Sequence, residues 1–384
     1  MQFIKTTTHF DFIGKRRPAL FISTVLNLAI LVGIALFGFN FGVDFAGGTL
    51  VEVKFKEPIS AQQVRERAQK GGLHDVTVQG IGSAEENSFL LRLGGVTQLT
   101  REGAAAAETV VRGLGEVQLF RSDLDNGIIN VRTKEQVDPQ KLREAVAGSG
   151  TGVKEVRALG EAQGGGFDYQ LVSAGMAEKV QDALKAGAAK ADFQVQRIDY
   201  VGPQVGKQLR NKGIMALVYA MIAILIYVAF RFEFKFGPGA LLAMLHDVVM
   251  VCGYFLVSRR EFNLTSIAVL LTIIGYSIND TIVIYDRIRE EMARFKGKPL
   301  PEIINIAVNE TLSRTILTGG VTALSLVGLL IFGVGEIFDF AMAMLIGIIV
   351  GTYSSVYIAS PLTIWLDERA ARAAERGGMK ARVA

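Results

Sequence analysis

Cysteine and histidine are scarce in this sequence of 384 residues. The single cysteine, Cys252, falls inside an apolar run, so no disulfide can form within the chain. The three histidines, His9, His74 and His246, lie in three separate regions, which is a poor basis for a metal site. We therefore expect the chain to bind no metal and no cofactor.

Sequence signatures of enzymes are also missing. The glycine-rich segment QGGGFD, around 164–166, lacks the preceding strand, the spacing and the following helix of a dinucleotide-binding loop, so we interpret it as a hairpin turn. The region around it contains no phosphate loop and no nucleophile with a partner base. A net charge of +4 does not require a nucleic-acid partner, because basic loops facing anionic lipid account for it. We expect no enzymatic activity.

Hydrophobic residues, in contrast, make up 50% of the chain, and the charged 20% is concentrated in blocks. Runs of about 20 apolar residues can cross a hydrocarbon core about 30 Å thick. The first run is too long for the core of a signal peptide, so we expect it to be retained. The pattern predicts an α-helical polytopic membrane protein with six spans, residues 18–39, 213–230, 236–257, 264–285, 312–332 and 338–366.

The distribution of lysine and arginine predicts the orientation of these spans. Basic residues precede span one and follow spans two, four and six, all on one side, which the positive-inside rule makes cytoplasmic. Both the N-terminus, 1–17, and the tail, 367–384, are then cytoplasmic. Basic residues on the other side run against this assignment without reversing it; they are Arg259, Arg260, Lys207, Arg210 and Lys212.

One large hydrophilic region, 40–205, lies between spans one and two, and this topology makes it periplasmic. Its period-2 and amphipathic segments follow the order strand, helix, strand, strand, helix, strand, and that order occurs twice. We predict an α+β domain of two tandem ferredoxin-like units, about 48–121 and 126–201. The alternative is one larger irregular α+β domain.

Three ionisable residues inside the spans are candidate functional residues, because such groups are costly in lipid. Asp280 stands in span four, and helical spacing places Thr272, Tyr276 and Asn279 on its side. Arg314 enters span five from the same side of the membrane, so we expect the two to meet. Asp247 lies near the middle of span three, beside His246.

Each candidate has a structural alternative. Asp280 and Arg314 could form a static ion pair, Arg314 could extend to the interface, and Asp247 could bond to a backbone carbonyl. The functional interpretation is a proton relay. Burial and a nearby arginine act on a carboxylate in opposite directions, so such a group can load and release a proton. A sodium site would need more oxygen ligands than this region plainly supplies.

Several longer segments resemble the SecF family of bacterial protein-export proteins, which is related to the resistance-nodulation-division transporters. These segments are FNFGVDFAGGTLVEV after span one, VGPQVGKQLRNKG before span two, LHDV in span three, IGYSINDTIVIYDRIRE in span four, NETLSRTILT into span five and IGIIVGTYSSVYIASPL in span six.

The resemblance implies a subunit that pairs with SecD in the bacterial inner membrane and assists the SecYEG channel. It implies use of the proton motive force to promote translocation of preproteins after the SecA-driven step, with YidC and YajC as further candidate partners. Asp280 and Arg314 match the positions that the family uses for proton conduction, and Asp247 matches a motif position. A small-molecule or lipid exporter of the resistance-nodulation-division type and a purely structural scaffold are the alternatives.

Overall fold

The computed structural model divides the chain into a helical unit, Met1–Phe41 with Asn211–Ala384, and an α+β unit, Gly42–Arg210. The two units are described separately. Described residues are 8–369 and 372, without 74–75, 82–86, 95–96, 125, 163, 188–191 and 233–235. His74, Lys235 and most of the predicted cytoplasmic tail therefore lie outside the described residues.

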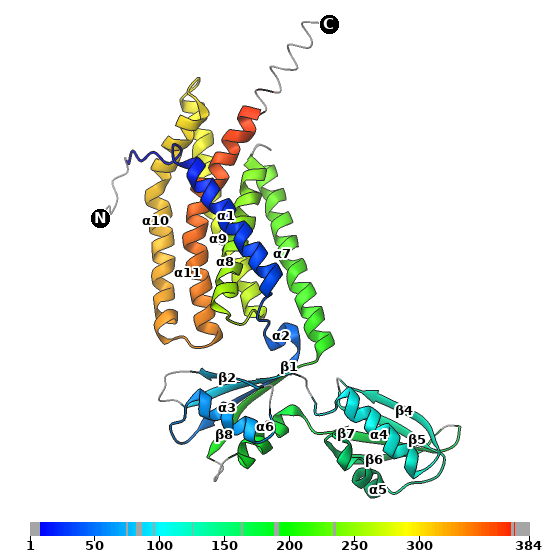
Figure 1. Cartoon of the computed structure of the whole chain (residues 1–384). Coiled ribbons are helices and arrows are strands. Elements are labelled where there is room, and N and C mark those ends of the chain that lie inside the picture. Colours follow the sequence, from blue (N-terminus) through cyan, green and yellow to red (C-terminus); the bar gives the residue numbers. More distant parts are fainter. Residues whose placement is uncertain are drawn as a thin grey trace, which may run out of the picture. The chain divides into compact units, whose positions relative to one another are not determined.

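Six described helices are long and apolar enough to cross a membrane, which confirms the predicted fold class (Figure 1). Several extend beyond the predicted spans; α10, for example, begins twelve residues before position 312, because a polar helical segment precedes its apolar part. The helices are α1 (Arg16–Phe37), α7 (Pro203–Arg231), α8 (Gly237–Ser258), α9 (Leu264–Arg294), α10 (Leu300–Phe332) and α11 (Glu336–Ser354), the last continuing through a π-helical turn (Ser355–Ala359) toward Arg369.

Helix α9 is the central helix of this unit. The helix begins with a capping box. The side-chain oxygen of Asn263 accepts a hydrogen bond from the backbone N–H of Ser266, and the Ser266 hydroxyl accepts one from the backbone N–H of Asn263. Large side chains such as Ile274 and Tyr285 are fully buried against α8, α10 and α11. The buried side of α9 is therefore shielded from lipid by the neighbouring helices of the same chain.

Helix α11 lies directly on α9 because two glycines face it. A Cβ atom at Gly347 would overlap the side chain of Ile273, and one at Gly351 would lie 2.9 Å from Cβ of Ser277. Small residues at four-residue spacing allow such close approach in membrane helices. This contact brings the backbones close enough for short side chains to bond across the interface.

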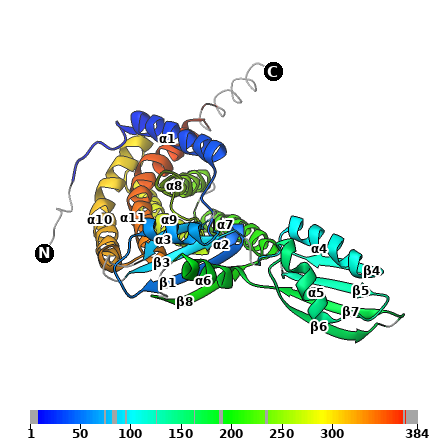
Figure 2. The ribbon, with the colours of Figure 1, turned by 60° about the horizontal axis from the view of Figure 1, so that its bottom comes forward.

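The α+β unit contains two antiparallel four-stranded sheets, in the orders β2-β3-β1-β8 and β4-β5-β7-β6. Figure 2 shows two helices on one face of each sheet: α3 and α6 cover the first, and α4 and α5 the second. The elements are α2 (Val43–Ala46), β1 (Gly48–Phe55), α3 (Ala61–Lys70), β2 (Val76–Ile81), β3 (Ser88–Leu93), α4 (Arg101–Leu114), β4 (Val117–Asp123), β5 (Ile128–Thr133), α5 (Pro139–Val146), a 3₁₀ turn (Ala147–Ser149), β6 (Val153–Glu161), β7 (Phe167–Ser173), α6 (Met176–Ala186) and β8 (Phe193–Val201).

The predicted tandem arrangement, 48–121 followed by 126–201, is wrong. Strand β8 pairs with β1, from Gly48 opposite Val201 to Phe55 opposite Phe193, and so closes the first sheet. Helix α6 packs into the core of that sheet, while α4 packs into the core of the second. The second sheet and its helices are thus inserted between β3 and α6. Amphipathic periodicity predicts the buried face of each helix but not the sheet that covers it, so sequence could not distinguish the two arrangements.

The inserted unit begins and ends at neighbouring positions. Thr97 and Gly175 form an antiparallel bridge, and the backbone N–H of Gln98 donates to the carbonyl of Ala174 at 3.0 Å. The first sheet keeps a complete core of its own, formed by β1, β2, β3, β8, α3 and α6.

An ion pair joins two central strands of the inserted unit. Arg132 on β5 and Asp168 on β7 are cross-strand partners, with Nε to Oδ1 at 2.7 Å and Nη2 to Oδ2 at 2.9 Å. The hydrogen bond from Arg132 lowers the pKa of Asp168 from its ordinary value. The pair therefore stabilises the folded state most where Asp168 is ionised.

Excision tests the nested topology. Replacing 95–174 by a short Gly-Ser linker should leave a soluble unit of 42–210 that still unfolds cooperatively, because the first sheet loses no core element. Deleting 122–201 instead should prevent folding, since it removes α6 and β8. Circular dichroism during thermal unfolding measures both. A folded product from the second deletion alone would contradict the nested arrangement.

Acid should remove the contribution of the Arg132–Asp168 pair. Because the pKa is lower in the folded state, the stabilisation is present above the unfolded-state pKa of about 3.9 and disappears as pH falls through the folded-state value. Asp168→Asn should lower the urea midpoint of the α+β unit at pH 7 and have progressively less effect toward pH 2. Asp182→Asn, at a carboxylate without an ion pair among the described residues, is the control. A pH-independent loss would show that packing alone is affected.

Candidate functional site

Asp247 on α8 is fully buried and bonds to side chains from two other helices. Its Oδ2 accepts hydrogen bonds from the hydroxyls of Ser277 on α9 and Ser354 on α11, the latter at 2.8 Å. Its Oδ1 lies 2.9 Å from Nδ1 of His246. The sequence left open that Asp247 bonds to a backbone carbonyl. In the structure its hydrogen-bond partners among the described residues are side chains. Asp247 is the point at which α8, α9 and α11 are joined.

Asp280 on α9 is also buried, at 2% exposure. The hydroxyl of Thr352 on α11 donates to its Oδ2 at 3.5 Å, which is a long hydrogen bond. One residue further along α9, the hydroxyl of Thr281 lies 2.8 Å from that of Ser355. Two predicted neighbours of Asp280, Thr272 and Asn279, are exposed instead, because they lie around the helix from the buried side.

Arg314 lies on α10 and is exposed, without an ion pair to Asp280 among the described residues. The static ion pair considered from the sequence is not formed in this structure. Asp280 is buried and Arg314 is exposed, and Asp247 belongs to a separate hydrogen-bonded cluster.

Gly319 of α10 lies close to side chains of α9 and α11. A Cβ atom at Gly319 would be 3.6 Å from Cγ2 of Ile348 and 3.8 Å from the hydroxyls of both Tyr276 and Thr352. The Tyr276 hydroxyl is buried and has no hydrogen-bond partner among the described residues. Gly319 therefore lies beside both the unbonded Tyr276 hydroxyl and the Thr352 hydroxyl that contacts Asp280.

Three hydroxyl residues at the end of α11 and the start of the π-helical turn contact polar groups of the neighbouring helices. Thr352 bonds to Asp280, Ser354 to Asp247 and Ser355 to Thr281. The π-helical turn starts at Ser355, and such turns occur often at functional sites. These hydroxyl groups were not among the residues predicted from the sequence. The signal was present as hydroxyl residues four apart on α9, Ser277 and Thr281, and as the adjacent pair Ser354 and Ser355.

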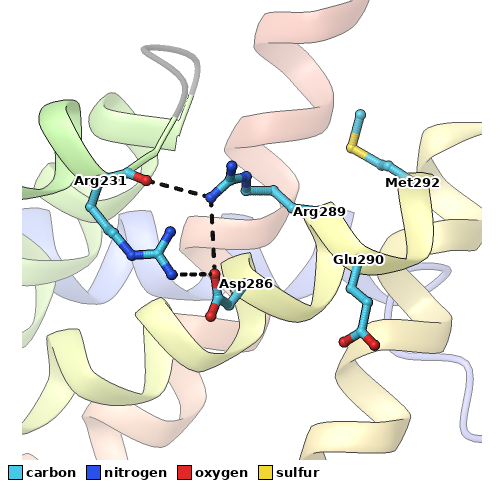
Figure 3. A pocket seen from close by; sticks show the side chains of 5 residues that line it. All are labelled: Arg231, Asp286, Arg289, Glu290 and Met292. Atoms are coloured by element: carbon cyan, nitrogen blue, oxygen red, sulfur yellow. Dashed lines mark hydrogen bonds and ion pairs between the residues drawn. The ribbon is translucent and has the colours of Figure 1, made fainter. Parts of the chain in front are cut away.

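An ionic cluster at the end of α9 is distinct from the buried carboxylates. Figure 3 shows Arg231 and Arg289 directed toward Asp286, at 2.9 Å and 4.0 Å. Arg287 nearby pairs with Glu290 at 2.6 Å and with Glu291 at 3.1 Å. Glu291 is fully buried. The contacts of Arg231 with Asp286 and Arg289 hold the end of α9 against the end of α7.

No group of three or more histidine, cysteine, aspartate or glutamate side chains in the described part of the chain is placed to bind a metal ion. The carboxylates, the hydroxyls and the imidazole of His246 can bind, release and pass protons.

Comparison with known families gives two matches. A model described as the C-terminal part of the protein export membrane protein SecD/SecF matches residues 179–369, and one described as the SecD/SecF GG motif matches 32–59. Gly47 and Gly48 of that second segment have φ angles of 75° and 134°, which favour glycine. A Cβ at Gly47 would also lie 2.8 Å from the backbone of Pro203. The motif therefore has a steric basis in this chain.

Curated relatives match almost from end to end. Protein translocase subunit SecF of Magnetococcus marinus is 40% identical over 369 residues, which cover 96% of this chain and 95% of the relative. The subunit of the same name from Koribacter versatilis is 34% identical, covering 94% and 92%. These matches run through the α+β unit as well as the helices.

Solved structures of SecDF are similar to this chain in fold. SecDF from Thermus thermophilus, described as a translocon-associated membrane protein, is 26% identical with a TM-score of 0.63. SecDF in a super-membrane-facing form is 27% identical with a TM-score of 0.59. The match covers 95% of this chain but only 40% of the Thermus chain.

Removing one hydroxyl from the Asp247 cluster should destabilise the helical unit. Ser354→Ala leaves a buried carboxylate with one donor fewer, which should cost about 1 kcal/mol and lower the apparent melting temperature in detergent. Ser325→Ala is the matched control, since that exposed hydroxyl bonds only within α10. Equal shifts in the two variants would show that the cluster does not hold the helices together.

Proposed function

The chain belongs to the SecD/SecF family of protein-export membrane proteins, and we propose that, as a SecF-type subunit of the Sec apparatus, it couples proton movement to preprotein translocation. In this proposal the proton motive force promotes translocation through SecYEG after the SecA-driven step. The chain would act in the bacterial inner membrane with both termini in the cytoplasm, and the positive-inside distribution of basic residues supports that orientation.

The observation that carries the proposal is Asp280, a carboxylate buried inside a span and held by one long hydrogen bond. A locked ion pair would fix its charge. A carboxylate with a weak neutral partner instead changes protonation when a cation or water approaches. Arg314 on α10 is the cation in position to approach it.

Helix α11 supplies a path from proton binding to movement. Thr352 donates a hydrogen bond to Asp280. Within the next turn, Ser354 bonds to α8 and Ser355 bonds to α9. Neutralising Asp280 removes the charged acceptor of Thr352 and so favours a shift of α11. Whether α11 shifts relative to α8 then depends on whether the hydrogen bond from Ser354 to Asp247 is kept or broken. Each proton crossing the membrane supplies about 2.3 kcal/mol per 100 mV, so several protons could drive a conformational cycle.

A SecD-type partner fits the outer surface of α10. Arg314 is exposed there together with Leu317, Val321 and Leu324. An arginine facing lipid inside a span is unfavourable by about 3 kcal/mol, so a second protein that covers it is favoured. The relatives of known structure are SecDF proteins, in which this chain would correspond to less than half of the length.

Export assays in inverted vesicles test the coupling. With this chain and its SecD-type partner present, Asp280→Asn and Arg314→Ala should each abolish the part of preprotein export that depends on the proton gradient. Asp286→Asn, an exposed carboxylate on the same helix, and Arg372→Ala, an exposed arginine near the C-terminus, are the controls. Equal membrane insertion of every variant is checked first. Unchanged gradient-dependent export in Asp280→Asn would overturn the proposal.

A further inference from the structure

A groove of about 550 Å³ lies on the surface of the helical unit, between α1, α8 and α11. Its walls are mostly apolar, with Ile22 on one side and Met250 on another, and Lys15 stands at one end. Volume and lining are in the range of sites that bind apolar ligands. Neither the ionic cluster at the end of α9 nor the Asp280 site shares this groove.

The packing of α1 creates the groove. At one end α1 touches α8 so closely that a Cβ atom at Gly253 would lie 2.6 Å from the side chain of Ile30. Toward its beginning, α1 is held by Tyr353 of α11, whose hydroxyl donates to the carbonyl of Ala19 at 3.0 Å and lies 2.9 Å from the hydroxyl of Ser23. The tyrosine ring keeps the helices apart and forms part of the wall.

Besides Ser23 and two tyrosines, the imidazole of His246 lines the groove. His246 is 7% exposed, and its Nδ1 contacts Asp247, while Nε2 has no hydrogen-bond partner among the described residues. The adjacent residues therefore face opposite ways: Asp247 bonds toward α9 and α11, and His246 borders the lipid side. Any molecule in the groove packs against the residue that contacts Asp247.

The groove spans about half of the membrane. His246 lies nine residues beyond Gly237, the first residue of α8, and a rise of 1.5 Å per residue places it about 14 Å from that end. A hydrocarbon core about 30 Å thick has leaflets of about 15 Å. The groove thus reaches from the interface to about the middle of the bilayer, which is the depth of one acyl chain.

Charge at the mouth of the groove selects the headgroup. Lys15 is exposed, has no acidic partner among the described residues and immediately precedes α1. Juxtamembrane lysines attract anionic lipids. We propose that the groove binds one acyl chain of an anionic glycerophospholipid, with the headgroup phosphate at Lys15 and the chain extending to His246. The bound chain excludes water from the groove side of His246. This site is independent of the proposed proton coupling.

Photocrosslinking in nanodiscs tests the site on the complex of this chain with its SecD-type partner. The probe is phosphatidylglycerol with a diazirine on one acyl chain, and peptides containing Met250 or Ile349 should be labelled. Ile22→Trp, which fills the groove, should reduce this labelling about fivefold. Leu28→Trp is the matched control, because Leu28 is a similarly exposed residue of α1 outside the groove, at 57% against 62% for Ile22.

The headgroup is tested separately. Lys15→Gln should reduce labelling by the phosphatidylglycerol probe about fivefold and leave labelling by the corresponding phosphatidylcholine probe unchanged. Met250→Trp fills the groove from α8 if Ile22→Trp folds poorly. Equal labelling in Ile22→Trp and Leu28→Trp would overturn the proposal, because annular lipid would explain it. So would protected groove peptides, because the partner protein would then occupy the surface.

Discussion

The close contact between α9 and α11 is the feature on which the membrane unit depends. It exists because Gly347 and Gly351 have no side chains where the two helices meet. Serine and threonine side chains are short and can bond across a helix interface only when the backbones approach closely. The bonds from Ser354 and Ser355 to neighbouring helices therefore follow from those glycines. So does the burial of Asp247 among hydrogen-bonding side chains.

Local structure of the α+β unit could be predicted from the sequence almost completely. The sequence predicts helices at 61–70 and 101–114 and strands at 88–93 and 193–201, and α3, α4, β3 and β8 have these bounds. Pairing between distant strands could not be predicted, because β1 accepts β8 from almost 150 positions away through backbone hydrogen bonds that any sequence can make. The repeated order of elements made a tandem arrangement equally consistent with the same hydrophobic pattern.

The charged residues of the candidate site could be predicted from the sequence, but their uncharged partners could not. Asp247 and Asp280 stand out in apolar runs, and both are buried. Their hydroxyl partners did not stand out, since serine and threonine are common in membrane helices and carry little cost there. The face of α9 was misjudged at Asn279 because helical spacing gives the angle between residues but not which direction faces the bundle.

The neighbouring ends of the inserted unit give the soluble part of the protein a modular construction. The chain leaves the first sheet at Thr97 and returns to it at Gly175, and these two residues are bridge partners. The two ends of the insertion are therefore as close together as the ends of a tight loop. A gene could therefore acquire, lose or exchange everything between these positions in a single recombination event without disturbing the strands on either side. The same position offers a rigid two-point attachment for a fluorescent domain, which would report movement of the first sheet without a flexible tether.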